Sequence, residues 1–149
     1  MDKNKVLFVF VSGFVVLLDQ LSKYFARQYL TKRSITIVDK FISLTFVKNE
    51  GAVFGLFQGS RVLFIILSFL AIIFISAFVL KAKLPLFLSI PISFVYGGVA
   101  GNLLDRIFLG YVTDFIYLNH WPVFNIADSM IDIGIVLIIF YMVKYGKNL

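Results

Sequence analysis

The chain of 149 residues has no cysteine, a single histidine and little charge. Without cysteine it has no disulfide framework, no thiol nucleophile and no zinc–thiolate site. A histidine metal site needs more than one ligand, and the H-E-x-x-H pattern of metalloproteases is absent. His120 is also without a nucleophile-elbow sequence nearby, which argues against a Ser-His-Asp hydrolase. We therefore expect neither a metal nor a cofactor.

Charged residues make up only 15% of the chain and hydrophobic residues 60%, with a mean hydropathy of +0.96. About a quarter of the residues of an ordinary soluble domain are charged, so this composition indicates a membrane protein. The net charge of +6 comes from basic residues scattered among loops, with no basic aromatic surface. This charge is typical of residues that flank membrane spans, and we expect no nucleic-acid partner.

Four apolar runs are long enough to cross a membrane, which takes about 20 residues. They cover residues 6–28, 62–80, 84–104 and 126–143. The first begins like a signal peptide, but no cleavage site follows it, so we interpret it as a retained helix. In the third, Pro91 predicts a kink, while Gly97 and Gly101 form a small-xxx-small pair that admits a close helix neighbour. The prediction is an α-helical polytopic membrane protein with one domain over residues 1–149.

An even number of spans places both termini on one side of the membrane. Six lysines then share the side of the termini: Lys3, Lys5, Lys81, Lys83, Lys144 and Lys147. Such a concentration predicts cytoplasmic termini. The first long loop carries an equal number of basic residues, namely Arg27, Lys32, Arg33, Lys40, Lys48 and Arg61. Charge alone therefore does not decide the orientation.

That first loop also contains two short segments in which apolar and polar residues alternate, residues 35–37 and 42–46. Alternation with a period of two predicts half-buried strands, with Asp39 and Lys40 in the turn between them. We expect a small β-cradle over about residues 33–57 on the outer face of the membrane. Residues 49–55 follow, rich in small residues that let the backbone approach another chain.

Polar residues recur at helical spacing in three of the spans. Asp19 and Lys23 are four residues apart and share a face, either as a structural ion pair or as part of a site. Asn102, Asp105 and Arg106 share a face at the end of the third span, where the plain alternative is a helix end that reaches the interface. Asn125, Asp128, Ser129 and Asp132 form a stripe on the fourth helix.

That stripe must face other helices or water, because a charge at the centre of a membrane helix costs about 2.5–3.5 kcal/mol. Asp114 lies close before it in the sequence, and carboxylate pairs can hydrolyse peptide bonds. From spacing alone, a hydrolase and a small transporter explain these aspartates equally well. A transporter usually has internal repeats, and the sequence shows none. A scaffold would leave the aspartates unexplained, and adjacent Ser22 and Lys23 point too far apart for a Ser–Lys peptidase.

Five short motifs in order along the chain resemble those of bacterial lipoprotein signal peptidase, also called signal peptidase II. They are residues 19–23 (Asp-Gln-Leu-Ser-Lys), 49–54 (Asn-Glu-Gly-Ala-Val-Phe), 97–106 (Gly-Gly-Val-Ala-Gly-Asn-Leu-Leu-Asp-Arg), 112–115 (Val-Thr-Asp-Phe) and 124–128 (Phe-Asn-Ile-Ala-Asp). Each motif alone is weak, but five collinear motifs on four spans are specific. The resemblance covers nearly the whole chain.

The resemblance implies a membrane aspartyl endopeptidase with Asp114 and Asp128 as its catalytic dyad. It implies supporting or substrate-contacting roles for Asp19, Lys23, Asn49, Gly51, Asn102, Asp105, Arg106 and Asn125. We expect Lys23 and Asn102 to line the polar chamber between the helices. The implied fold has four transmembrane helices, a small outer β-cradle and a short amphipathic outer helix. Residues 116–123 are few for that helix, so we expect it to be reduced.

The resemblance also implies the substrate, a prolipoprotein modified with diacylglycerol and cleaved just before the lipidated cysteine. The protein would lie in the bacterial inner membrane among lipids, as a monomer, with its active site near the outer face. Asp132 lies outside the five motifs. From its position one turn beyond Asp128 we expect a buried polar group, hydrogen-bonded to a neighbouring helix and not coupled to the dyad.

Overall fold

The computed structural model describes residues 2–51, 60–82 and 84–145. Its helices are α1 (Lys3–Tyr29), α2 (Arg61–Lys81), α3 (Leu86–Phe108) and α4 (Ile126–Tyr145), and its strands are β1 (Ile35–Val38), β2 (Ile42–Asn49) and β3 (Val112–Leu118). Each of the four helices is long and apolar enough to cross a membrane. The predicted fold class is therefore confirmed. The helix bounds differ from the predicted spans by no more than four residues at either end.

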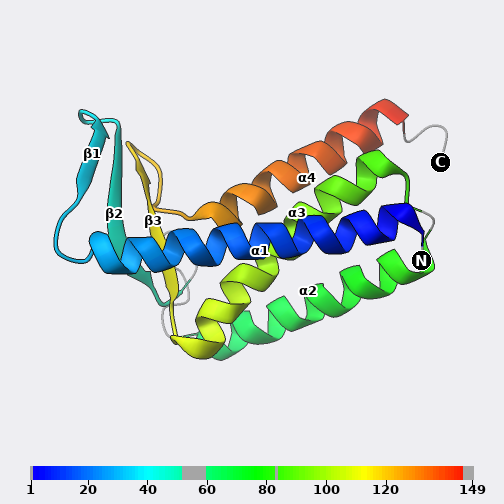
Figure 1. Cartoon of the computed structure of the whole chain (residues 1–149), viewed down its shortest axis with the longest axis horizontal. Coiled ribbons are helices and arrows are strands. Elements are labelled where there is room, and N and C mark those ends of the chain that lie inside the picture. The colour runs from blue at the N-terminus through cyan, green and yellow to red at the C-terminus, as the bar shows by residue number, and fades with distance from the viewer. Residues whose placement is uncertain (1, 52–59, 83, 146–149) are drawn as a thin grey trace.

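The helix α3 lies at the centre of the bundle and packs against α1, α2 and α4 (Figure 1). Glycines allow the close approach on two of its faces. A Cβ atom on Gly97 would lie 2.7 Å from the Val15 Cβ, and one on Gly101 would lie 2.5 Å from Asp19 Oδ2. On the side of α4, a Cβ on Gly98 would lie 2.5 Å from the Ala127 carbonyl oxygen. The predicted small-xxx-small contact at Gly97 and Gly101 is confirmed, with α1 as the neighbour.

Pro91 lies inside α3, and the helix continues on both sides of it. A Cβ on Gly134 of α4 would lie 2.7 Å from the Pro91 carbonyl oxygen, so the two helices approach closely there as well. The kink expected at Pro91 stays a prediction.

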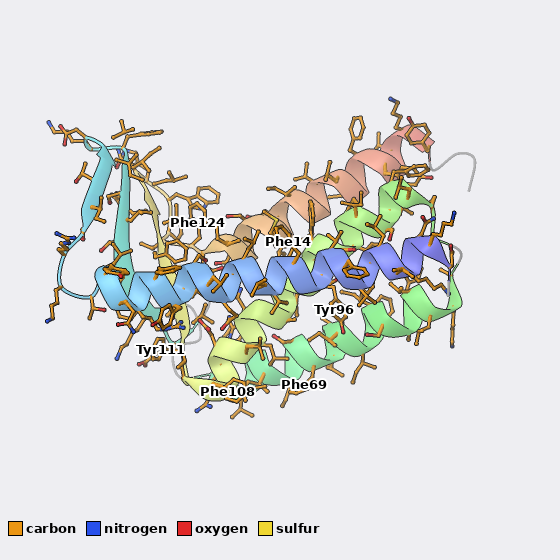
Figure 2. All side chains as sticks on the ribbon, viewed as in Figure 1. Phe14, Phe69, Tyr96, Phe108, Tyr111 and Phe124 are labelled. Carbon is orange, nitrogen blue, oxygen red and sulfur yellow. The ribbon has the colours of Figure 1, made fainter. Side chains whose placement is uncertain are left out.

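The outer faces of the helices are covered with large apolar side chains (Figure 2). Phe10, Phe74 and Phe140 are each at least 60% exposed, as suits side chains that meet lipid. Buried positions are instead often small or polar, including Ser89 and Ser93 of α3. This inversion is expected in a bilayer, where lipid solvates apolar side chains and close packing holds the helices together.

Both termini and the connection between α2 and α3 lie at one end of the bundle, and the sheet lies at the other (Figure 1). At the end with the termini, hydrogen bonds join the start of α1 to the chain around the end of α2 and the start of α3. Lys5 Nζ donates to the Leu80 carbonyl at 2.7 Å, and Asn4 Nδ2 donates to the Leu84 carbonyl at 2.8 Å. Lysines of the described helices at this end are Lys3, Lys5, Lys81 and Lys144. Lys83 and Lys147 lie outside the described residues.

The sheet is antiparallel with the order β1-β2-β3. The two predicted strands are present, and β2 continues to Asn49. The cradle expected over residues 33–57 lacked one strand. This strand is β3, which comes much later in the chain, pairs with β2 and places Asp114 opposite Val47. Residues 52–57 lie outside the described residues.

The segment in which we expected a reduced outer helix forms none. Its first residues complete β3, a turn follows, and Ile116 bridges to Phe124. The main chain of this segment thus pairs with β2, with Phe41 and across the turn, instead of forming a helical turn.

Candidate active site

The chain turns back along β3 before it enters α4, and this return brings two distant carboxylates together. The main-chain N–H groups of Phe115 and Ile116 both donate to the Phe124 carbonyl, at 3.0 and 2.8 Å. Asn125 therefore emerges beside β3, and its Nδ2 donates to Asp114 Oδ1 at 2.7 Å. Asn125 is fully buried, so its contacts replace those with water.

Asn125 also caps the start of α4 and thereby fixes Asp128 within the first turn. Asn125 Oδ1 accepts a hydrogen bond from the Asp128 main-chain N–H at 2.9 Å. In return, Asp128 Oδ2 accepts one from the Asn125 main-chain N–H at 3.2 Å. This reciprocal arrangement is a capping box, with an asparagine and an aspartate in place of the more usual serine and glutamate. One residue thus holds both carboxylates.

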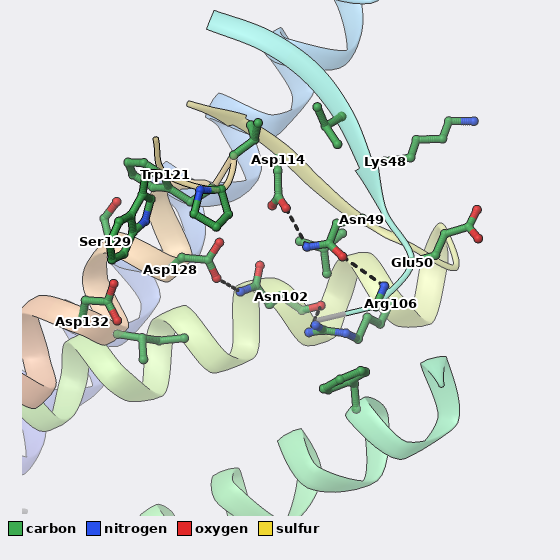
Figure 3. A pocket seen from close by; sticks show the side chains of 18 of the residues that line it. Lys48, Asn49, Glu50, Asn102, Arg106, Asp114, Trp121, Asp128, Ser129 and Asp132 are labelled. Carbon is green, nitrogen blue, oxygen red and sulfur yellow. Dashed lines mark hydrogen bonds between the residues drawn. The ribbon is translucent and has the colours of Figure 1, made fainter. Parts of the chain in front are cut away.

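Neutral amides surround both carboxylates (Figure 3). Asp114 Oδ2 accepts from Asn49 Nδ2 at 2.8 Å, and Asp128 Oδ1 accepts from Asn102 Nδ2 at 2.8 Å. In the described part of the chain, no lysine or arginine forms an ion pair with either carboxylate. Their negative charge is therefore held by amide donors alone, and both remain open to the same pocket.

A buried lysine determines which way the Asn102 amide faces. Lys23 Nζ, which can only donate, lies 2.8 Å from Asn102 Oδ1, and Asn125 Nδ2 donates to the same oxygen at 3.1 Å. The Asn102 Nδ2 group must then face Asp128. Lys23 therefore acts on the carboxylate pair through Asn102, without contacting either carboxylate.

Lys23 is itself held between two carboxylates of the helix core. Its Nζ lies 2.8 Å from Asp19 Oδ2 and 3.5 Å from Asp105 Oδ2, and all three side chains are inaccessible to solvent. The prediction that Asp19 and Lys23 share a helix face is confirmed, and the two side chains form an ion pair. Asp19 also accepts from the Ala127 main-chain N–H at 2.9 Å, which ties α1 to the start of α4.

Three residues of this cluster were not singled out from the sequence. Gln20 Nε2 donates to Asp19, to Asp105 and to the Gly101 carbonyl, at 3.0–3.2 Å. The Thr113 main-chain N–H donates to Asp105 Oδ2 at 2.8 Å, and Arg27 Nη1 reaches Thr113 Oγ1 at 3.0 Å. Arg27 could have been found, because it continues the spacing of four residues that links Asp19 to Lys23. The contact of Thr113 requires β3, which the alternation of apolar and polar residues did not predict.

A pocket of about 930 Å³ opens beside the two carboxylates. Its lining comes from β2, the start of α2, the end of α3, β3, the turn before α4 and the first two turns of α4. The predicted site residues that line it are Asn49, Gly51, Asn102, Arg106, Asp114 and Asp128. Those that lie behind its wall are Asp19, Lys23, Asp105 and Asn125. Positions 52–54 of the second motif lie outside the described residues.

Two expectations about individual side chains were wrong. Lys23 does not line the chamber, because Asp19, Asp105 and Asn102 enclose its ammonium group. Asp132 is exposed on the pocket wall and has no hydrogen bond to any described residue, so it is not a buried group bonded to a neighbouring helix.

Two alternative catalytic arrangements have no support in the described residues. Ser22 Oγ donates to the Asp19 carbonyl at 2.8 Å, while Lys23 is engaged elsewhere, so the two do not form a Ser–Lys pair. His120 occupies the turn after β3 with a φ of 64° and does not line the pocket. Within the described ranges, no three His, Cys, Asp or Glu side chains gather as a metal site would require.

Asp114 lies in β3, outside the membrane-spanning helices, and its environment favours the protonated form. Burial, followed by the negative charge of Asp128, raises the pKa of Asp114 to about 7, although the Asn49 and Asn125 hydrogen bonds act in the opposite direction. Two neighbouring carboxylates without a contacting cation do not readily ionise together. Near neutral pH this pair can therefore hold one proton and one negative charge.

The fold and the site define a class of multi-pass membrane protein with a carboxylate pair at one end of its helix bundle. A family model described as signal peptidase (SPase) II matches residues 11–144. The chain belongs to the signal peptidase II family. It is therefore a transmembrane protease of lipoprotein processing.

Individual relatives agree with this assignment. A lipoprotein signal peptidase of Syntrophus aciditrophicus is 37% identical, and the alignment covers 99% of both chains. One from Halothermothrix orenii is 39% identical over 89% of this chain and 92% of its own. A solved bacterial membrane enzyme matches with a TM-score of 0.86 at 33% identity, over 95% of this chain and 90% of that one. The transporter and scaffold interpretations are thereby set aside.

Proposed function

We propose that this protein is an aspartyl endopeptidase that removes signal peptides from diacylglyceryl-modified prolipoproteins, with Asp114 and Asp128 as its catalytic pair. The observation that carries the proposal is that both carboxylates line one pocket and are held by the same residue, Asn125. The relatives named lipoprotein signal peptidase support the substrate class. The bond cleaved is the one before the lipidated cysteine.

The chemistry begins with one carboxyl protonated and the other ionised. The ionised carboxylate takes a proton from a water molecule between them as the water oxygen bonds to the scissile carbonyl carbon. The protonated carboxyl donates its proton to the carbonyl oxygen, which gives a neutral gem-diol. Transfer of a proton to the amide nitrogen then breaks the C–N bond and releases an acid and an amine. Neither a covalent intermediate nor a cofactor is needed.

The surrounding amides preserve the position of both carboxylates while their charges change. Asn102 and Asn125 are oriented by groups that can only donate, Lys23 and a main-chain N–H, so neither amide can turn over during the reaction. A fixed polar environment of this kind stabilises developing charge without reorganisation at the moment of reaction.

The position of the pocket suits a substrate that is part lipid and part peptide. The pocket is lined by Phe64 of α2 and by Ile131 and Ile133 of α4, all in helices that cross the membrane. A diacylglyceryl group can therefore remain in lipid while its peptide bond reaches Asp128. As the resemblance implies, we place the pocket near the outer face of the inner membrane and the end with the termini in the cytoplasm. Lys3, Lys5, Lys81 and Lys144 at that end agree with this orientation. A monomer contains the whole site.

The decisive experiment is cleavage of a purified diacylglyceryl prolipoprotein by the purified protein in detergent or lipid. We expect cleavage before the lipidated cysteine that persists in excess chelator and in serine- or thiol-directed reagents. Loss of activity in chelator that added metal restores would overturn the aspartyl mechanism. Equal cleavage of the unlipidated precursor would overturn the proposed substrate class.

A further inference from the structure

We propose that Asp132 selects among substrates by accepting a hydrogen bond from a hydroxyl side chain of the signal peptide, about two residues before the scissile bond. The proposal rests on the proposed function and extends it to the sequence that the pocket prefers. Asp132 differs from the four other aspartates of the helix bundle and β3.

The other four aspartates are all satisfied within the protein. Asp19, Asp105, Asp114 and Asp128 each accept at least two hydrogen bonds or ion-pair contacts from described residues. Asp132 accepts none from the described part of the chain, although it lies in a helix that spans the membrane. An acidic side chain in such a segment is costly unless a donor faces it, and a molecule bound in the pocket can supply that donor.

Asp132 faces the same pocket as Asp128. The side chains of Asp128, Ser129 and Asp132 follow one another along the first turns of α4 at the pocket wall (Figure 3). Ser129 has its own partner, since its Oγ donates to the Asn125 carbonyl at 3.0 Å. Apolar Ile131 and Ile133 flank Asp132 in the lining. Asp132 is therefore an acceptor between two apolar side chains, and such a position favours a substrate group that can donate.

The direction of the helix indicates which part of the substrate meets this acceptor. Asp132 lies one turn beyond Asp128, about 6 Å further from the sheet and toward the end with the termini. A signal peptide lies in the membrane on the N-terminal side of the scissile bond, so it runs from Asp128 past Asp132. At about 3.3 Å per residue, an extended peptide covers this distance in about two residues. A hydroxyl group suits this depth better than an ammonium, which is much more costly to place in a membrane.

The test compares two diacylglyceryl prolipoproteins that differ only in serine or alanine at the second residue before the scissile bond. For the wild-type protein we expect kcat/KM to be about ten- to a hundredfold higher with serine, as befits a hydrogen bond to a charged acceptor. Asp132→Leu, which removes the acceptor, should bring the ratio to about one or below. Asp132→Asn, which keeps a carbonyl acceptor, should give an intermediate ratio. Leu137→Ala, an exposed position of α4 outside the pocket, should keep the wild-type ratio.

Equal preference for the two substrates in the wild-type protein would overturn the proposal. An equal loss of kcat/KM for both substrates in Asp132→Leu would also overturn it. Asp132 would then accept a hydrogen bond from a main-chain N–H of the substrate and not from the hydroxyl side chain. Failure of the wild-type protein to cleave either lipidated substrate would instead overturn the proposed function.

Discussion

Two groups of aspartates lie side by side in this protein and have opposite surroundings. Around Lys23, Asp19 and Asp105 contact a cation and are closed off from solvent. Around Asn125, Asp114 and Asp128 contact only amides and open into the pocket. A contacting cation offsets the charge of a carboxylate, whereas neutral amide donors do not. The first group therefore builds the site, and the second is fitted for proton transfer.

The two groups are connected through one side chain. Asn102 accepts from Lys23 with its oxygen and donates to Asp128 with its nitrogen. The charge of the first group thus fixes the geometry of the second without neutralising it. Replacing members of either group tests this division of roles.

The largest effect is expected from removing a titratable proton at the pocket. Asp114→Asn and Asp128→Asn should each lower cleavage of lipidated prolipoprotein by at least about a thousandfold, since an amide cannot exchange the proton that the reaction needs. Cleavage is followed by the mobility shift of the substrate. Asp39→Asn, in the exposed turn between β1 and β2, is the matched control and should keep full activity. Near-normal turnover in either pocket variant would refute the catalytic assignment.

The next effect concerns the cation of the first group. Lys23→Met should lower the free energy of unfolding by about 3–5 kcal/mol, because Asp19 and Asp105 lose their buried partner. Activity should also fall, because Asn102 is no longer oriented. Thermal unfolding in detergent and specific activity measure the two effects separately, and Lys32→Met in an exposed loop is the control.

The double variant Lys23→Met with Asp19→Asn tests whether the stability lost in Lys23→Met is due to buried charge. It removes one of the two carboxylates that Lys23 contacts, so part of the stability should return. No recovery would indicate that the stability lost in Lys23→Met comes from packing rather than from charge.

A smaller effect is expected where α1 and α3 meet. Gly101→Ala should destabilise the protein by about 1–3 kcal/mol, since the new Cβ would lie 2.5 Å from the Asp19 oxygen that bonds to Lys23. Gly13→Ala is the matched control, because a Cβ there meets nothing within 4 Å and alanine favours a helix. The melting temperatures of the two variants should move in opposite directions or differ clearly. Equal melting temperatures would contradict the close contact at Gly101.

The last effect is a dependence of stability on pH. The pKa of Asp114 is raised to about 7 in the folded protein, from an ordinary value of 3.8. Between these values the unfolded chain has lost a proton that the folded protein keeps, so this contribution to stability is complete below about pH 4 and is lost as the pH rises through 7. Asp114→Asn should reduce the fall in melting temperature between pH 5 and pH 8. Asp39→Asn should leave the fall unchanged, and an identical fall in Asp114→Asn would refute the raised pKa.

The sequence predicted the parts of this site that lie within single elements. The ion pair of Asp19 and Lys23 follows from helical spacing, and Gly97 and Gly101 predicted a close helix neighbour, which the structure identifies as α1. It did not predict β3, whose residues lie far from β1 and β2 in the chain. Nor did it predict that Lys23 lies behind Asn102 while Asp132 faces the pocket, because spacing shows which residues share a face but not which element that face meets.

By itself, the sequence determined four membrane spans and a set of polar residues on three of them, because the length and polarity of a segment decide whether a bilayer accepts it. Only the tertiary structure decided which carboxylates face the pocket. That choice depends on the pairing of β3 with β2 and on the return of the chain beside β3. These contacts place Asn125 between Asp114 and Asp128, the two carboxylates that line the pocket. Lys23 pairs with Asp19 and Asp105, the two carboxylates that hold the helices together.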